Sequence, residues 1–147
     1  MKDSLENILL KSTNDHGILR LTLNDQDNKN ALSELMMQEL LKAISDASKD
    51  NSVKVIVIAS TGDVFCSGHN LKEINEAKKS DDNAESYYLG LFKTCSSLMQ
   101  LIINCSKPVI AEVNGIATAA GCQLVASCDL AFSSDFSKFA TPGVNIG

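Results

Sequence analysis

The chain has 147 residues, of which 44% are hydrophobic and 21% charged, with a net charge of −5. This composition indicates one globular domain with a sizeable core, and the acidic balance without a basic cluster excludes a nucleic-acid-binding footprint. The apolar runs are too short to span a bilayer. Residues 1–6 lack both an apolar signal region and an arginine-rich transit pattern, so a cytoplasmic protein is expected, although a processed organellar protein would look the same.

The first regular elements predicted are a strand, a helix and a second strand. Gly17 to Asn24 alternates leucines with polar residues, as in a half-buried strand. Ser33 to Ser48 carries apolar residues at helical spacing, with Ser33 as the N-cap. Val53 to Ala59 is a β-branched run, typical of a strand covered on both faces. This order favours a parallel βαβ unit.

Further elements follow along the chain. Lys72 to Asn83 is polar and predicts a mobile surface segment, and Ala84 to Cys105 is a long amphipathic helix. Asp129 to Ser133 predicts a short strand and Asp135 to Lys138 a turn, after which Phe139 to Gly147 ends the chain without a closing helix. The apolar stripe of the long helix, interpreted as packing core, consists of Tyr88, Leu91, Phe92, Cys95, Leu98, Met99 and Ile102.

Cysteine and histidine usage predicts no disulfide and no metal. The five cysteines are 66, 95, 105, 122 and 128, an odd number without a CxxC motif, which indicates free thiols in a reducing compartment. Neither His16 nor His69 has a second histidine or a cysteine at metal-ligand spacing.

The stretch around residues 106–124 organises the chain. Val109 to Val113 predicts a buried strand, and Asn114-Gly115 supplies a turn. Only small residues follow, from Ala117 to Gly121, before an apolar run. Small residues where a loop becomes a helix leave the first helical N–H groups unpaired and open to an anion. The alternative is tight packing of a helix against a sheet.

A second junction of this kind, Ser67 to Leu71, follows the β-branched strand. Two N–H donors from separate loops are what a thioester oxyanion hole needs. From about Gly17 to its last residue the sequence resembles the crotonase (enoyl-CoA hydratase/isomerase) superfamily. The matching segments are Lys29 to Leu32, Phe65 to Glu73, Lys107 to Ala111 with Asn114-Gly115, and Gly121 to Leu124 with Cys128-Asp129.

The resemblance implies an α/β fold, a crotonase-like spiral of ββα turns, and an acyl-CoA ligand. It implies that the N–H groups of His69 and Ala120 hold the thioester oxygen, although Ala120 replaces a usual glycine. It implies no cofactor beyond coenzyme A as part of the substrate. The residues expected to bind coenzyme A are Lys29, Ala31, Leu32, Gly68, His69, Asn70, Leu71, Lys72 and Gly121.

The acids depart from the family pattern. By the resemblance, Gln123 and Gly143 stand where the hydratases have their two glutamates, and Asn70 replaces a common aspartate. An amide does not transfer protons near pH 7, and losing such a group costs roughly 10²–10⁴-fold in rate. An intact oxyanion hole is worth about 2.7–4 kcal/mol per donor, so thioester binding can persist while hydration is nearly lost.

Three functions therefore stay open. The first is an acyl-CoA-binding hydratase/isomerase homologue of fatty-acid metabolism with impaired hydration. The second is a non-catalytic acyl-CoA-binding or assembly module. The third is other thioester chemistry in the same hole, hydrolysis or decarboxylation, for which the His69 side chain, Cys66 and Cys122 are candidates. Glu112, in a buried-looking strand, is assigned a structural role.

Length is the second departure. Family members are nearly twice as long, so residues 1–147 are interpreted as a single truncated domain, or a fragment, without the C-terminal helical region. In the family that region covers the spiral, completes the acyl pocket and builds a trimer. An incompletely covered core is expected, together with a homo-oligomer (trimer or hexamer in full-length members) or partial disorder near Phe139 to Gly147.

Overall fold

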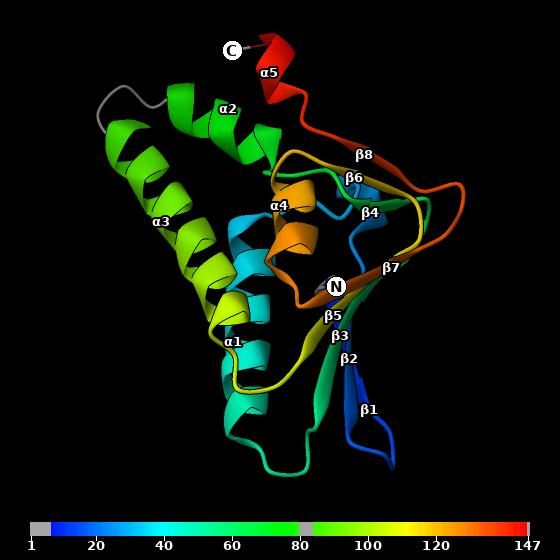
Figure 1. The fold of residues 1–147 in the computed structure, drawn as a ribbon. Helices are drawn as coiled ribbons and strands as arrows, with labels where there is room; N and C mark the ends of the chain where they lie inside the picture. Colours follow the sequence, from blue (N-terminus) through cyan, green and yellow to red (C-terminus); the bar gives the residue numbers. More distant parts are fainter. Residues whose placement is uncertain (1–6, 80–83, 147) are drawn as a thin grey trace, which may run out of the picture.

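The computed structural model describes residues 7–79 and 84–146, so Met1–Glu6, on which the location was judged, lie outside the described residues. The expected α/β class is confirmed: a five-stranded sheet of order β1-β2-β3-β5-β7 and a three-stranded sheet β4-β6-β8 pack with helices (Figure 1). The strands are β1 (Leu9–Thr13), β2 (Ile18–Leu23), β3 (Val55–Ser60), β4 (Val64–Cys66), β5 (Val109–Val113), β6 (Ile116–Thr118), β7 (Leu130–Ser133) and β8 (Lys138–Ala140). The helices are the 3₁₀ turn η1 (Gln26–Asn28), α1 (Glu34–Lys49), α2 (Leu71–Lys79), α3 (Ala84–Ile103), α4 (Ala120–Ser127) and α5 (Gly143–Ile146).

The predicted βαβ unit is present as β2, α1 and β3. Strands β2 and β3 pair in parallel, with Leu21 opposite Ile58, and both side chains are fully buried. The Ser33 side chain accepts a hydrogen bond from the Met36 N–H at 3.1 Å, which caps α1 as expected. The leucine alternation and the helical stripe therefore meet in one core.

Helices α1 and α3 lie on the same side of the large sheet (Figure 1). Most of the α3 stripe is buried there, including Leu98 and Ile102. Two members differ from the prediction: Tyr88 is half-buried and Phe92 is 57% exposed. Both lie in the first half of α3, the half that is nearer to α2 (Figure 1). These two side chains therefore form part of the protein surface.

The opposite face of the large sheet is not covered by any helix of the described residues, so the expectation that residues 53–59 are covered on both faces is wrong (Figure 1). Val55 and Val57 are only half-buried. Glu112 also proves exposed. Both terminal guanidinium nitrogens of Arg20 donate to its carboxylate, and the bond from Nη1 is 2.8 Å long. Its structural role is thus a cross-strand ion pair on an open face.

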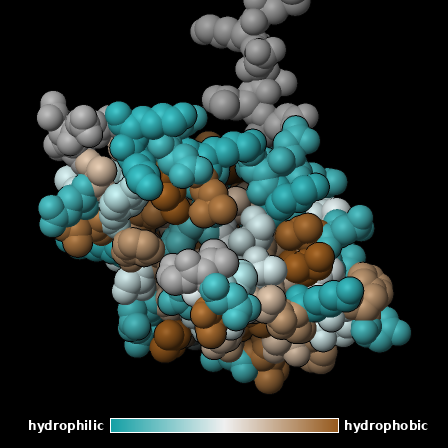
Figure 2. All heavy atoms as spheres, turned by 90° about the horizontal axis from the view of Figure 1, so that it is seen from above, coloured by the Kyte–Doolittle hydropathy of each residue, from teal (hydrophilic) through white to brown (hydrophobic). Residues whose placement is uncertain are grey.

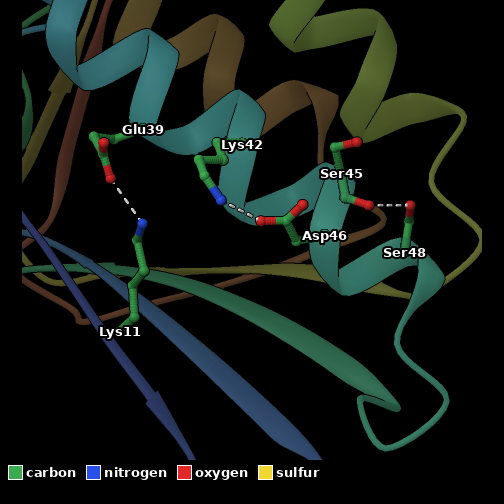
Figure 3. A network of polar contacts seen from close by, with 6 residues as sticks. All are labelled: Lys11, Glu39, Lys42, Ser45, Asp46 and Ser48. Atoms are coloured by element: carbon green, nitrogen blue, oxygen red, sulfur yellow. Dashed lines mark hydrogen bonds and ion pairs between the residues drawn. The ribbon is translucent and has the colours of Figure 1, made fainter.

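The N-terminal hairpin was not predicted. Strand β1 pairs antiparallel with β2, and Lys11 Nζ lies 2.7 Å from Glu39 Oε2, which ties β1 to α1 (Figure 3). The same surface of α1 carries an ion pair of Lys42 with Asp46, one turn apart. These exposed ion pairs contribute little to stability, and the buried apolar side of α1 holds the helix in place.

Two irregular segments expected from the sequence are partly helical. The polar segment 72–83 forms most of α2 up to Lys79, and residues 80–83 lie outside the described part. At the end of the chain, β8 and the single turn α5 replace the expected irregular ending up to residue 146. Within the described residues, no helix has the length and apolarity needed to cross a membrane.

Candidate functional site

The two small-residue junctions lie against each other. Gly68 has φ +92°, and a Cβ placed on it would stand 3.0 Å from the Ala119 Cβ and 3.2 Å from the Ala120 nitrogen. Gly121 is equally tight, because a Cβ there would stand 2.2 Å from the Cys66 carbonyl oxygen. Close packing, the alternative offered for these small residues, is therefore real at Gly121, and the same packing brings the two loops together.

Among the described residues, the backbone N–H groups at this junction that lack a protein acceptor include those of His69 and Ala120. The N–H groups of Cys122 and Gln123, further along α4, both donate to the Ala119 carbonyl oxygen, whereas that of Gly121 has no protein acceptor among the described residues. The free N–H of Ala120 thus lies at the N-terminus of α4, where the helix dipole favours negative charge.

Hydrogen bonds fix the loop that carries His69. The Leu32 N–H donates to the Gly68 carbonyl at 2.7 Å, and the Ser67 N–H donates to the Lys29 carbonyl at 3.2 Å. From the other side, the Thr118 hydroxyl donates to the Ser67 carbonyl at 3.0 Å. Two segments far apart in sequence, residues 29–32 and Thr118, therefore hold the loop that carries His69.

Beside this loop lies a cleft of about 260 Å³ between η1 and the start of α2. It brings together six of the nine residues predicted to bind coenzyme A, namely Lys29, Ala31, His69, Asn70, Leu71 and Lys72. The other three, Leu32, Gly68 and Gly121, are buried and do not line it. Asp27, Asn28 and Ser67 complete the lining and were not predicted to bind coenzyme A, although Ser67 begins the predicted junction Ser67 to Leu71.

Polar side chains organise the two walls of the cleft. Lys72 Nζ donates to Asn28 Oδ1 at 2.8 Å, which joins the start of α2 to η1. Asn70 Oδ1 accepts from the Lys72 N–H at 3.0 Å, so the Asn70 side chain caps α2. With Lys29, the cleft offers two cations, which suit a phosphorylated ligand.

The His69 side chain lies at the inner end of this loop. Its ring packs edge-on to Phe92 with 5.6 Å between centroids. Burial lowers the pKa of His69, opposed by an interaction with the Leu32 backbone, so the imidazole is neutral near pH 7. Its Nδ1 is shielded from solvent and has no hydrogen-bond partner among the described residues.

Gln123 and Gly143, the positions that the resemblance implies for two glutamates, carry no acid. Gln123 is an exposed amide one turn into α4. Gly143 is the exposed first residue of α5, and a Cβ placed there would meet nothing within 4 Å. Neither residue provides a group that transfers protons near pH 7.

The thiols near the junction are poor nucleophiles. Cys66 is fully buried, and this burial raises the pKa of its thiol to about 12. The Cys122 Sγ lies 3.0 Å from the Ala117 carbonyl oxygen, to which the thiol donates. In the described part of the chain, no three His, Cys, Asp or Glu side chains are grouped closely enough to hold a metal ion.

Known proteins are similar to this chain over most of its length. The family model described as enoyl-CoA hydratase/isomerase matches residues 13–147. A curated relative from Xenopus laevis, "Enoyl-CoA hydratase domain-containing protein 3, mitochondrial", is 53% identical over 133 residues, which are 90% of this chain and 44% of the relative. The human protein of that name is 50% identical over 89% of this chain and 42% of its own length. The chain thus spans less than half the length of these relatives.

Solved structures have the same fold. The crystal structure of human enoyl Coenzyme A hydratase domain-containing protein 3 superposes with a TM-score of 0.87 at 45% identity and covers 96% of this chain and 53% of its own. An enoyl-CoA hydratase from Bacillus anthracis has the same TM-score at 20% identity, covering 96% of this chain and 53% of its own. The second likeness extends to the fold alone.

Proposed function

Because the chain belongs to the enoyl-CoA hydratase/isomerase family, we propose that it binds acyl-CoA thioesters, with the thioester oxygen between the N–H groups of His69 and Ala120, and that it is a poor hydratase. The observation that carries the proposal is the pair of unpaired N–H groups from two loops packed against each other. Such donors stabilise the negative charge that develops on a thioester oxygen, by about 2.7–4 kcal/mol each.

The surroundings suit the remainder of such a ligand. The Lys29 and Lys72 side chains line the cleft and can neutralise phosphates of the coenzyme. Phe92 beside His69 and Leu71, which is 69% exposed, offer apolar contact for a pantetheine arm or acyl chain. Figure 2, which views the end of the molecule that bears α2 and α5, shows hydrophobic groups among hydrophilic ones on this face. This mixture of cations and apolar groups matches the two ends of an acyl-CoA.

Hydration needs more than a polarised thioester. Water must lose a proton and the substrate must gain one, and the amide of Gln123 and the hydrogen of Gly143 serve neither purpose. Among the described residues lining the cleft, His69 is the one side chain whose ordinary pKa is near neutral. A binding or assembly module is therefore the second candidate, favoured by the same missing acids, whereas thioester hydrolysis or decarboxylation finds no activated nucleophile in Cys66.

The relatives suggest a location, and the open face of the large sheet suggests an assembly. Their printed names say mitochondrial, and we propose the same compartment for this protein in place of the cytoplasmic expectation. Free thiols fit the reducing matrix as well as the cytoplasm. Leu130 and Phe132, 58% and 64% exposed on the open face of the large sheet, support the expected homo-oligomer.

The test is calorimetric titration of the protein with a non-hydrolysable thioether analogue of butyryl-CoA, paired with an assay of crotonyl-CoA hydration. We expect binding without appreciable turnover, and loss of binding in His69→Pro, which deletes one N–H donor. His69→Gln, which keeps that N–H, is the matched control and should still bind. If the folded wild-type protein does not bind the analogue, the proposal is overturned. If the wild type hydrates crotonyl-CoA and His69→Pro abolishes this activity, the proposal that the protein is a poor hydratase is overturned.

A further inference from the structure

Asn30 is a buried amide beneath one wall of the cleft. It is 1% exposed, whereas its neighbour Lys29 is exposed and lines the cleft. Asn30 itself does not line the cleft, so it has no contact with the proposed ligand. A polar side chain that is buried this deeply is held by hydrogen bonds.

The Asn30 amide uses its acceptor and both of its donors. Its Oδ1 accepts from the Asp25 N–H at 2.8 Å, and its Nδ2 donates to the carbonyls of Thr61 and Val64 at 2.9 and 2.7 Å. The loop that carries η1 is thereby bound to the turn between β3 and β4. Only an amide of this length supplies one acceptor and two donors in these directions.

The backbone at Asn30 depends on the same contacts. Lys29 and Asn30 both have left-handed conformations, with φ of 57° and 51°. Such angles are costly for residues other than glycine, and asparagine is among the residues that tolerate them best. The Asn30 N–H donates to the Asp25 carbonyl at 2.7 Å, which closes the loop around the buried amide.

The loop then supports the oxyanion junction. The Lys29 carbonyl accepts the Ser67 N–H at 3.2 Å, and Leu32, two residues after Asn30, donates its N–H to the Gly68 carbonyl at 2.7 Å. A displacement of this loop would therefore move both the Lys29 wall and the peptide that presents the His69 N–H.

We propose that Asn30 is a positioning residue for acyl-CoA binding: its buried amide holds the 25–31 loop so that Lys29 and the His69 N–H face one ligand. This inference rests on the proposed function of the cleft. Its action is indirect, through Lys29 and Gly68, and it requires no contact between Asn30 and the ligand.

The test compares Asn30→Gly and Asn30→Asp with the wild type. Glycine keeps the left-handed backbone and removes the amide, whereas aspartate keeps the shape and places an acceptor against two carbonyl oxygens. We expect both folded variants to bind the butyryl-CoA thioether at least ~10-fold more weakly, as lost buried hydrogen bonds displace the loop. Hydrogen exchange of amides 25–31 should rise at least ~10-fold in Asn30→Gly, while amides in 36–49 of α1 change little.

Ser33→Ala is the matched control, since Ser33 is 6% exposed and caps α1 through a single hydrogen bond. It should cost about 1 kcal/mol of stability and leave affinity within about twofold. Folded Asn30→Gly with wild-type affinity overturns the inference while the proposed function stands. If the wild type does not bind the analogue, the proposed function fails, and unchanged exchange of amides 25–31 in Asn30→Gly would separately refute the positioning of the loop.

Discussion

Gly68 and Ala120 are in contact across two loops: a methyl group on Gly68 would stand 3.2 Å from the Ala120 nitrogen. The peptide after Gly68 carries the His69 N–H, and among the described residues neither this N–H nor that of Ala120 donates to a protein acceptor. The two loops therefore approach so closely at this point that a side chain at Gly68 would crowd the Ala120 nitrogen.

Gly68→Ala should damage both stability and binding. Its φ of +92° disfavours alanine, and the new methyl would crowd Ala119 as well. We expect a loss of about 1–3 kcal/mol in the free energy of unfolding, measured in urea, and a loss of acyl-CoA affinity in the protein that remains folded.

Gly90→Ala provides the control for this substitution. Gly90 lies inside α3, and a Cβ there would meet nothing within 4 Å. Alanine should stabilise the helix by about 0.5–1 kcal/mol and leave affinity unchanged. Equal affinities for Gly68→Ala and Gly90→Ala would show that the contact between the loops does not govern binding.

Under the proposed function, placing acids at residues 123 and 143 should raise the rate of hydration. Gln123→Glu combined with Gly143→Glu supplies the two carboxyl groups, and the open space around Gly143 admits the side chain. We expect crotonyl-CoA hydration to rise by roughly 10²-fold or more over the wild type, with smaller gains for either substitution alone. A double variant that binds acyl-CoA and hydrates no faster than the wild type would place the defect elsewhere.

His69 should make stability depend on pH. Burial lowers the pKa of His69 in the folded protein, so the unfolded chain binds more protons in the window below the ordinary histidine range. Stability is therefore complete above pH 6.5 and falls as the pH drops through the lowered pKa. Urea unfolding at pH 7.5 and 5.5 should show a smaller loss in His69→Gln than in the wild type. His16→Gln, at an exposed turn, is the control, and parallel losses in all three proteins would contradict the assignment.

The long elements were predictable from sequence because their patterns repeat several times. The helix predicted from Ser33 to Ser48, with Ser33 as its N-cap, corresponds to α1, and each predicted end lies within one residue of the observed end. The second sheet was missed because β4, β6 and β8 have three residues each, too few to show alternation. Ala117 lies in β6, but a small residue in a short strand looks the same in the sequence as a small residue in a loop.

Some parts of the candidate site could likewise be predicted from the sequence and others could not. The pairing of His69 with Ala120 came from a family resemblance, since no local pattern reports that two loops meet. Asn30 was invisible as a positioning residue because it stands in a polar loop, where asparagine is ordinary. Its burial depends on the Thr61 and Val64 carbonyls, which only the folded chain brings to it.

The Arg20–Glu112 ion pair should contribute little. Its hydrogen bonds lower the pKa of Glu112, so its contribution is present above the ordinary glutamate range and is lost as the pH falls through the lowered pKa. Both side chains are over 40% exposed, at 42% and 48%, and solvent screens them. A double-mutant cycle with Arg20→Met and Glu112→Gln at pH 7 should give a coupling of about 0.2–1 kcal/mol. A coupling well above this range would mean that the open face is shielded in solution, as in an oligomer.

Ala119→Gly should stabilise the protein. Ala119 has φ 52° and ψ −122°, a conformation that alanine rarely adopts, and it is the N-cap of α4 without a side-chain hydrogen bond. Glycine relieves the strain and is the better N-cap, although it adds freedom to the unfolded chain, so we expect a net gain of up to about 1 kcal/mol. Ala126→Gly, at an exposed site within α4, is the control and should lose about 0.5–1 kcal/mol. Because the Ala119 carbonyl accepts the N–H groups of Cys122 and Gln123, relaxation at residue 119 should keep the Ala120 N–H free and acyl-CoA affinity unchanged. A loss of affinity in the stabilised variant would instead show that the strained alanine peptide is what aims this donor.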